Sequence, residues 1–534
     1  MTPNSGVRET PLAPLDVLVI GAGPTGLTMA SELLLHGASV RIIDAQVNQL
    51  RESRAFGVQA RTLELLDRRG LARDLISRGH TDLRLIRHTP GGRRAGIVFT
   101  DVGMRDTRFP FMLVVSQLET EDVLEAHLRS LGGSVERGVT LTGFAQDDAG
   151  VRAVISHPDG RTEQVQASYL VGADGAHSTV RQAAGIEFEG GTYEMTWFLA
   201  DLDVDGPLEP GWAHAFPTAS SITMFVPLGR PAPWRLMAVE LQRSSGAADT
   251  RATPTLQELQ RVVERGVGLP LRLHSDVFRS RFRTHHRMAQ RFRAGRVFLA
   301  GDAGHIHSPL GAQGMNTGIQ DAWNLAWKLA LVVRGHSPGE LLDSYEAERM
   351  PVARHVLGFT DRLFAIMVSQ TWPARLWRGY GLPVVTALAA RSRPLRRRLF
   401  HRLSQLEIEY RDSPVSQQAT GGLRPRAGER LPDIELPSGQ GWVHEQLDGP
   451  RYHLLVCEPP ADPAGLAQLQ RRYDELVAVR RLPAGTWGGG VVLVRPDGYI
   501  AFRGTTDGPE LGAYLQRWLQ PPVPKPAQVP RPAH

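Results

Sequence analysis

The residues best suited to chemistry lie in two glycine-rich turns, each placed between an apolar strand and a helix. In the first turn, "GAGPTG" (residues 21–26) follows the apolar stretch Val17–Ile20 and precedes a helix that reaches about His36. The spacing G-x-G-x-x-G allows a tight turn, close approach of the backbone to a pyrophosphate, and close packing of helix on strand. Unpaired N–H groups at the start of the helix favour phosphate binding. We therefore predict a dinucleotide site here.

Asp44 strengthens this prediction, because it ends the next apolar strand, 18 residues after Gly26. A carboxylate in this place can accept hydrogen bonds from the ribose of a dinucleotide. The fingerprint occurs once, so two choices stay open at this point: bound NAD(P), or bound FAD with a nicotinamide that docks transiently. The predicted contacts of this turn are Gly21, Ala22, Gly23, Thr25, Gly26 and Asp44.

The second turn, "GDAGHIHSPLGAQGMN" (residues 301–316), favours FAD. Asp302 ends an apolar strand and can hydrogen-bond a polyhydroxyl chain such as ribitol. The glycines from Gly311 onward, which lack side chains, would let the backbone approach a flat ring closely. A long helix follows, and its N-terminus would stabilise negative charge on a reduced isoalloxazine ring. Helical spacing gives it an apolar side made of Met315, Ile319, Ala322, Ala326, Leu329 and Val333.

Composition narrows the class of protein. The chain has 534 residues, of which 42% are hydrophobic and 22% charged, as in a soluble globular protein of roughly two to four domains. Cys457 is the only cysteine, so no disulfide framework or dithiol redox pair is expected. No signal peptide or transmembrane stretch is recognisable, which predicts a cytoplasmic protein without a membrane partner. The net charge of +6 is too mild to indicate nucleic acid, and His305 and His307 lack metal-site geometry.

Several other segments are expected to position or connect these turns. Strand–turn–helix patterns occur at 165–185 and 295–335, and alternation with aromatic residues at 187–280 predicts a half-buried sheet that could roof a pocket. The basic run "RSRPLRRRLFHR" (391–402) is typical of a solvated helix face, and 411–430 of a linker.

Four stretches together resemble the class A flavin-dependent aromatic hydroxylases, the p-hydroxybenzoate hydroxylase superfamily. Its long subgroup, which this chain resembles, includes pentachlorophenol 4-monooxygenase and the anthracycline and angucycline polyketide hydroxylases. The stretches are "VLVIGAGPTGL", "ESRAFGVQARTLELL", "YLVGADGAHSTVR" and "RVFLAGDAGHIHSPLGAQGMNTGIQDAWNLAWKL", and they span most of residues 15–350.

The resemblance implies an α/β fold in three parts. These are a Rossmann-like FAD-binding domain of the glutathione-reductase type, an inserted β-sheet substrate domain and a C-terminal thioredoxin-like domain that lacks Cys-x-x-Cys. The expected bounds are 15–81, 117–186 and 281–410 for the FAD-binding domain, 82–116 and 187–280 for the substrate domain, 411–430 for the linker, 431–519 for the thioredoxin-like domain and 520–534 for a Pro-rich tail.

The resemblance also implies roles for single residues. Arg54 matches an arginine near the FAD pyrophosphate and the nicotinamide path, and Gln117 matches a contact on the diphosphate side. Asp174 matches the Asp-Gly motif that handles both FAD and NAD(P)H, with Arg181 bracing its loop. Pro309 matches a proline beside the reacting edge of the flavin. The matches to the ribitol and the flavin pyrimidine are Gly301, Asp302, Gly311, Gly314, Met315 and Asn316.

The chain departs from the family pattern at two points. Gly304 replaces the usual alanine after the Gly-Asp-Ala of the second turn, which is a mild change. No match is found for the tyrosines that bind phenolate in the small benzoate hydroxylases, so the base that activates the substrate stays unassigned. His214, Phe225 and Arg235, from the aromatic 187–280 segment, are the candidate substrate contacts.

The function that the resemblance implies is oxygen insertion into an aromatic ring. NAD(P)H, with NADPH favoured, reduces FAD; O₂ then forms a C4a-hydroperoxyflavin, which hydroxylates a phenolic or polycyclic, polyketide-like substrate. Monomer and homodimer are both left open. The alternatives are a Baeyer–Villiger or epoxidising flavin monooxygenase on the same fold, and a non-catalytic FAD-fold binding protein.

Overall fold

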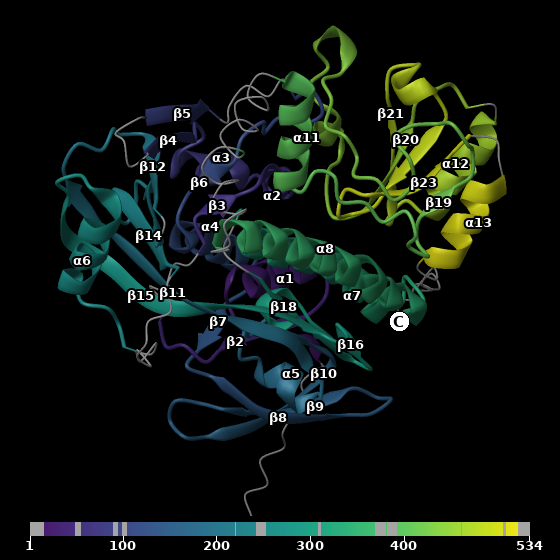
Figure 1. Cartoon of the computed structure of the whole chain (residues 1–534). Helices are drawn as coiled ribbons and strands as arrows, with labels where there is room; N and C mark the ends of the chain where they lie inside the picture. Colours follow the sequence, from purple (N-terminus) through teal and green to yellow (C-terminus); the bar gives the residue numbers. More distant parts are fainter. Residues whose placement is uncertain are drawn as a thin grey trace, which may run out of the picture.

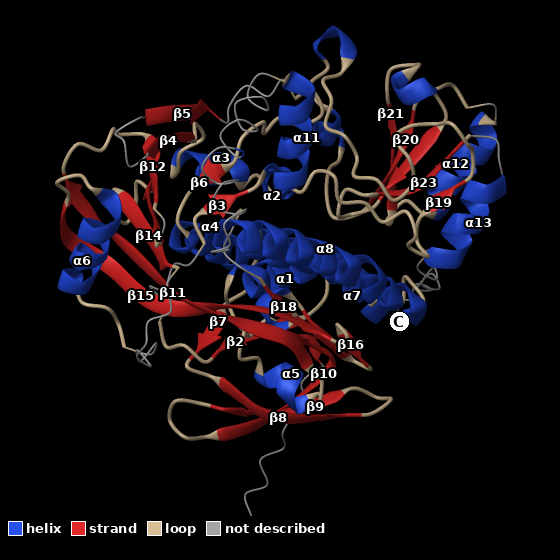
Figure 2. Cartoon of the chain, in the orientation of Figure 1, coloured by secondary structure: helices blue, strands red, loops and turns tan. Residues whose placement is uncertain are grey.

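The computed structural model describes residues 15–48, 55–88, 94–98, 104–218, 220–241, 252–307, 311–368, 381, 392–460, 462–505 and 509–521. Two predicted contacts, Arg54 and Pro309, and most of the Pro-rich tail lie outside the described residues. The fold is mixed α/β, with two large sheets and a smaller C-terminal one (Figures 1 and 2).

The first sheet carries both glycine-rich turns. Its parallel strands are β1 (Leu15–Ile20), β2 (Val40–Asp44), β10 (Thr162–Gly172) and β17 (Val297–Leu299); β1 pairs with β2 and β10, and β10 pairs with β17. Parallel strands end at one edge of a sheet, so the turns after β1, β10 and β17 meet there. Strand β7 (Val135–Arg137) also runs parallel, paired with β2. The other strands are β8 (Thr140–Gln146), β9 (Val151–Ser156) and β16 (Arg293–Ala294).

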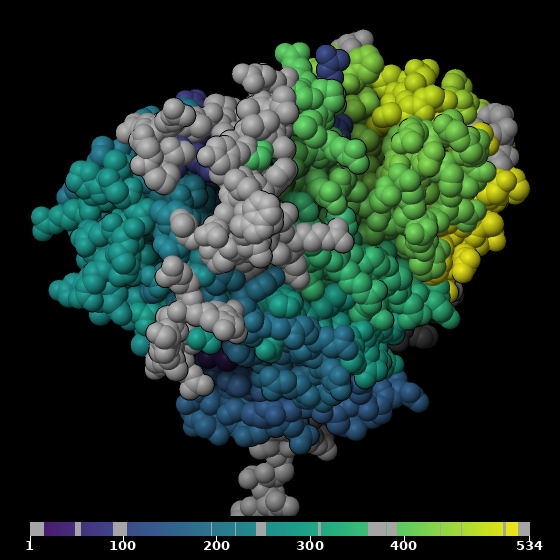
Figure 3. Space-filling model, viewed as in Figure 1, coloured from purple at the N-terminus to yellow at the C-terminus, as the bar shows by residue number. Residues whose placement is uncertain are grey.

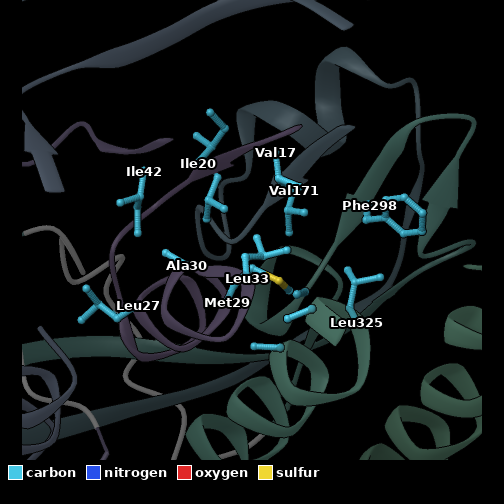
Figure 4. Packing of buried hydrophobic residues seen from close by; sticks show 14 of the residues in the cluster. Val17, Ile20, Leu27, Met29, Ala30, Leu33, Ile42, Val171, Phe298 and Leu325 are labelled. Carbon is cyan, nitrogen blue, oxygen red and sulfur yellow. The ribbon is translucent and has the colours of Figure 1, made fainter. Parts of the chain in front are cut away.

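Two helices that begin at these turns pack on each other over this sheet. They are α1 (Pro24–Leu35) and α7 (Gly314–Val333). Figure 4 shows side chains of β1 and α1, among them Val17 and Leu33, in one core with Leu325 of α7. The other helices of this region are α2 (Ala60–Asp67), α3 (Ala72–Ser77), α4 (Gln117–Ser130), α5 (Thr179–Ala183) and α8 (Asp343–Val368).

The long helix α7 has the predicted extent but is buried on all sides, not only on its apolar stripe. Every residue from Asn316 to Leu331 is buried. The reason is that the C-terminal domain covers the second side: Trp327 and Leu331 belong to a core that also includes Tyr452, whose ring centroid lies 5.5 Å from that of Trp327. Trp327 therefore serves packing.

The second sheet is mainly antiparallel, in the order β18-β15-β11-β14-β13-β12-β4-β5. Its long strands are β11 (Phe188–Asp205) and β15 (Arg272–Ala289), so the domain boundary expected at 280 falls inside a strand. One face packs on α6 (Leu256–Val267). The shorter strands are β4 (Arg84–His88), β5 (Arg94–Val98), β12 (Trp212–Pro217), β13 (Ser221–Pro227), β14 (Trp234–Glu240) and β18 (His305–Ile306). A separate pair is formed by β3 (Gly57–Val58) and β6 (Leu113–Val114).

The C-terminal domain is a five-stranded sheet in the order β19-β23-β22-β20-β21. Its elements are β19 (Gln417–Gln418), β20 (Tyr452–Val456), β21 (Val477–Arg481), β22 (Val491–Val494), β23 (Ile500–Gly504), α12 (Pro463–Arg472) and α13 (Pro509–Trp518). In the space-filling view, the yellow residues of this domain lie against the green residues that precede them in the chain (Figure 3).

Residues 411–430 do not form the linker expected from their composition. Strand β19 lies in this segment and pairs with β23, and Val415 is fully buried in the C-terminal core. Pro and Gly therefore mark tight turns here and not an unpacked chain. The basic run gives α11 (Arg393–Leu403), which has no buried residue, as expected of a solvated helix face. None of the described helices has the length and apolar character needed to cross a membrane.

Candidate functional site

The two glycine-rich turns line the same cavity, whose volume is about 310 Å³. It lies where the first sheet meets the second. Six of the predicted contacts form part of its wall: Gly23, Thr25, Gln117, Asp302, Gly314 and Met315. Other predicted contacts are their chain neighbours, so segments distant in the sequence are brought together here.

The three fingerprint glycines have different physical roles. A β-carbon on Gly21 (φ +99°) would lie 2.4 Å from the carbonyl oxygen of Ala173, and one on Gly26 would lie 1.9 Å from the carbonyl oxygen of Gly21. Both glycines are therefore required by packing. A β-carbon on Gly23 would meet nothing within 4 Å, and Gly23 lines the cavity. A bound group can therefore approach the backbone closely at Gly23.

The N-terminus of α1 is suited to an anion. Gly23 caps the helix without a side-chain hydrogen bond, and the first turn has no acidic residue. The first N–H groups of a helix have no partner within it and carry partial positive charge. Asp44 lies next to this turn and accepts a hydrogen bond from the N–H of Ala22 at 2.6 Å. Its carboxylate is thus held beside the turn, as a ribose ligand requires.

Gln117 connects the cavity wall to a buried acid. Its Oε1 accepts a hydrogen bond from the N–H of Ala55 at 3.2 Å, and its Nε2 donates to Glu121 at 2.7 Å. Burial raises the pKa of Glu121 to about 7. The structure thus adds to this end of the site a carboxylate that the sequence analysis missed; its spacing of four from Gln117 on one helix was the available signal.

Asp302 lies exposed on the turn after β17 and lines the cavity. Within the described residues it makes no hydrogen bond, so its carboxylate is available to a ligand. The turn itself is held from behind, because the Oδ2 of Asp321 accepts hydrogen bonds from the N–H of Gly301 (3.0 Å) and from Nε2 of His305 (2.7 Å). His305 thus holds this turn in place. The described residues contain no group of three side chains suited to a metal.

The turn after β10 is joined to the turn that carries Asp302. The Asp174 carboxylate accepts hydrogen bonds from Ser178 Oγ (2.5 Å) and from the N–H of Val180 (3.1 Å), and burial raises its pKa. Arg181 donates to the carbonyl oxygens of Ala176 (3.0 Å) and Ala303 (2.9 Å). Asp174 therefore serves its own loop, and Arg181 braces that loop against the second turn.

The start of α7 closes the site. The side chain of Asn316 is buried; its Oδ1 accepts from the N–H of Gln59 at 2.8 Å and its Nδ2 donates to the carbonyl of Gly57 at 2.9 Å. Gly318, which the sequence analysis did not single out, is needed here. A β-carbon on it would lie 2.3 Å from Oγ1 of Thr25. The need for glycine at this position comes from the close contact between α1 and α7, which the sequence alone does not show.

The residues predicted to contact substrate do not line the cavity. Phe225 is buried in the core beneath α6, and Arg235 is fully buried in an ion pair with Asp201. His214 is buried against His88, with 2.9 Å between the ring nitrogens. Aromatic residues in an alternating strand point to both faces, and the sequence could not tell which face is the cavity wall.

The wall on the side of the second sheet combines apolar and polar side chains. It was not predicted residue by residue, although the alternation in β15 was a usable signal. His285 is held by Thr192, with 2.7 Å between Nδ1 and Oγ1. The lining residues here are Phe56, Leu199, Phe282, Arg283, Thr284, His285, Ile306 and His307.

Known proteins resemble this chain over nearly its whole length. The model of the FAD binding domain matches residues 14–360, and that of the C-terminal part of aromatic-ring hydroxylases matches 424–522. A 6-methylpretetramide 4-monooxygenase of Streptomyces rimosus is 37% identical, covering 92% of this chain and 91% of that one. Pentachlorophenol 4-monooxygenase of Sphingobium chlorophenolicum is 31% identical, covering 92% and 94%. The solved anhydrotetracycline hydroxylase of Streptomyces rimosus has a TM-score of 0.78 at 32% identity, covering 96% and 100%.

Proposed function

The chain belongs to the FAD binding domain family and is a flavin-dependent aromatic monooxygenase, and we propose that it hydroxylates a polycyclic, phenol-bearing substrate with NAD(P)H and O₂. The observation that carries the proposal is the single cavity shared by both glycine-rich turns and by an apolar wall of the second sheet. One group bound along the turns would meet a second, flat molecule lying on that wall.

The residues of the cavity fit FAD. The open space at Gly23 and the start of α1, which no side chain caps, suit the pyrophosphate. Asp44 suits the ribose, and the exposed Asp302 suits the ribitol. The start of α7, at Gly314 and Met315, suits the flavin ring. When bound, FAD supplies the redox chemistry: it takes hydride from the nicotinamide and activates O₂.

The protein supplies position and exclusion of water. Phe56, Leu199 and Phe282 give an apolar wall, which would orient a flat ring and keep water from the reacting atoms. His285, held by Thr192, is the group on that wall best placed to accept a phenolic proton. We retain Arg54 and Pro309 as contacts of the pyrophosphate and the reacting flavin edge.

The polycyclic substrate class is proposed from this wall and from the relatives. Two of the relatives named above act, by their names, on a pretetramide and on an anhydrotetracycline. In architectural terms, we propose that the first sheet forms a Rossmann-like FAD-binding domain of the glutathione-reductase type. The second sheet is the substrate domain, and the C-terminal sheet is a thioredoxin-like domain without redox cysteines, since Cys457 is the only cysteine.

The test is NADPH oxidation by the purified, FAD-loaded protein with a panel of phenols and fused-ring polyketides. We expect a yellow protein whose NADPH consumption rises with a fused-ring phenol and yields a product heavier by one oxygen. NMR of the product separates ring hydroxylation from epoxidation and from insertion beside a ketone. Colourless protein that cannot be loaded with FAD would contradict the proposal.

A further inference from the structure

The turn that carries Asp302 is held by a buried carboxylate that does not line the cavity. We call residues 301–307 the cofactor turn. Asp321 of α7 has an exposed fraction of 0%, and its Oδ2 accepts hydrogen bonds from Gly301 and from His305. One oxygen atom therefore fixes the cofactor turn on both sides of Asp302.

Arg349 of α8 holds Asp321 in turn. Its Nε donates to Asp321 Oδ1 at 2.6 Å, its Nη2 to the carbonyl of Thr317 at 3.1 Å, and its Nη1 to the hydroxyl of Tyr410 at 2.8 Å. Burial disfavours the charge on Asp321, but Arg349, His305 and the hydrogen bond from Gly301 together lower the pKa of that carboxyl. Asp321 is thus an anion whose direction is set by a planar guanidinium, each nitrogen of which donates a hydrogen bond.

The C-terminal domain grips α8 at this point. Tyr410 is bound into that domain, because its N–H donates to the carbonyl of Gly428 at 2.7 Å and its ring packs on Tyr499 at 4.2 Å. Glu348, the neighbour of Arg349, accepts two hydrogen bonds from Arg495, which follows β22, at 2.6 and 2.8 Å. Two adjacent residues of α8, Glu348 and Arg349, are therefore hydrogen-bonded to Arg495 and Tyr410.

We infer that Arg349 is a positioning residue for the cofactor turn, acting through Asp321, and that the C-terminal domain fixes its place through Tyr410 and Arg495. The inference rests on the proposed function, since the cofactor turn is taken to hold FAD. Without Arg349, Asp321 would be a buried carboxylate without its cation, which is strongly unfavourable. Protonation or rotation of that carboxyl would then loosen its two hydrogen bonds to the turn.

The test compares Arg349→Met, Arg349→Lys and Tyr410→Phe in the full chain. Arg69→Met is the matched control: Arg69 also forms a buried two-bond ion pair, with Glu32 at 2.8 and 2.7 Å, and the pair makes no hydrogen bond to the cofactor turn within the described residues. The readouts are the dissociation constant of FAD, the visible absorption spectrum of the bound flavin, and the melting temperature of the apoprotein.

We expect Arg349→Met to bind FAD about tenfold more weakly and with a shifted visible spectrum, as follows from the loss of a hydrogen bond to a charged group. Arg349→Lys, which keeps the charge, should recover part of the affinity, and Tyr410→Phe should show a smaller change in the same direction. Arg69→Met should lower the melting temperature but leave the FAD affinity and spectrum unchanged.

A purely structural role for Arg349 predicts the opposite pattern, in which melting temperatures fall while FAD affinity and spectrum stay as in the wild type. That result in Arg349→Lys and Tyr410→Phe would overturn the inference. Tyr410→Phe removes one hydrogen bond, and Arg349→Lys keeps the positive charge. Neither opens a large cavity, so they decide the matter even where Arg349→Met does not fold. Failure of the wild-type chain to bind FAD would instead contradict the proposed function.

Discussion

Arg235 and Asp201 form a fully buried ion pair, in which the Nε–Oδ1 and Nη2–Oδ2 distances are both 2.7 Å. The remaining Nη1 of Arg235 donates to the carbonyl of Ala55 at 2.8 Å, and Ala55 lines the cavity. The pair therefore connects the second sheet to the cavity wall. Arg235, which was predicted to contact substrate, instead supports this wall through Ala55.

Arg235→Leu is expected to lower the free energy of unfolding by about 3–5 kcal/mol, since it leaves the Asp201 carboxylate buried without its cation. Urea unfolding measures this change. The double variant Asp201→Leu/Arg235→Leu should cost less than Arg235→Leu alone, because no isolated charge is left. Equal or larger destabilisation in the double variant would contradict this account of the pair.

Asp302→Ala is expected to reduce FAD retention strongly and to leave the stability of the apoprotein nearly unchanged. The carboxylate faces the cavity and makes no hydrogen bond within the described residues, so its removal costs the fold little. The ratio of flavin absorbance to protein absorbance after gel filtration measures retention. Full flavin occupancy in this variant would remove Asp302 from the site.

Gly23→Ala and Gly26→Ala should separate binding from folding. The added methyl in Gly23→Ala enters open cavity space, so we expect a wild-type melting temperature and weakened FAD binding. The methyl in Gly26→Ala would collide with the backbone of Gly21, which predicts a loss of about 1–3 kcal/mol in unfolding free energy. Thermal melts and FAD titration of both variants check this. Two variants with the same pattern would show that Gly23 has no separate role in binding.

Glu121 should make stability depend on pH. Burial raises its pKa from an ordinary 4.5 to about 7, so between these values the folded chain holds a proton that the unfolded chain has released. The contribution of Glu121 to stability is complete below about 4.5, falls as pH rises to about 7, and is constant above. In Glu121→Gln, urea unfolding from pH 4.5 to 7 should lose this downward slope. An unchanged slope would assign the pH dependence to other groups.

Local pattern was enough to predict where the glycine-rich turns lie. The fingerprint glycines, Asp44 and Asp302 lie where strand–turn–helix units place them, and these units are specified by short stretches of sequence. Side chains that act through tertiary contacts could not be predicted in the same way. The face on which a strand residue lies is set by its register, so Phe225 was misplaced and Phe282 was missed.

The same limit explains the misjudged segment at 411–430. Its Pro, Gly and Ser content is that of a linker, and only the pairing of β19 with β23 reveals that it is part of a sheet. Likewise, local sequence does not show the surroundings of the polar residues of α7. Asp321, Asn324 and Lys328 are paired inside the protein, where their partners Arg349 and Glu348 come from another helix.

The burial of α7 from two directions has a consequence for how this enzyme is put together. Without the C-terminal domain, Trp327 and Leu331 would be exposed to solvent. The shortened chain would then carry an apolar surface on the helix whose first turn lines the cavity. The C-terminal unit is therefore no detachable accessory. It shares a hydrophobic core with α7, so we expect neither part of the chain to fold stably without the other.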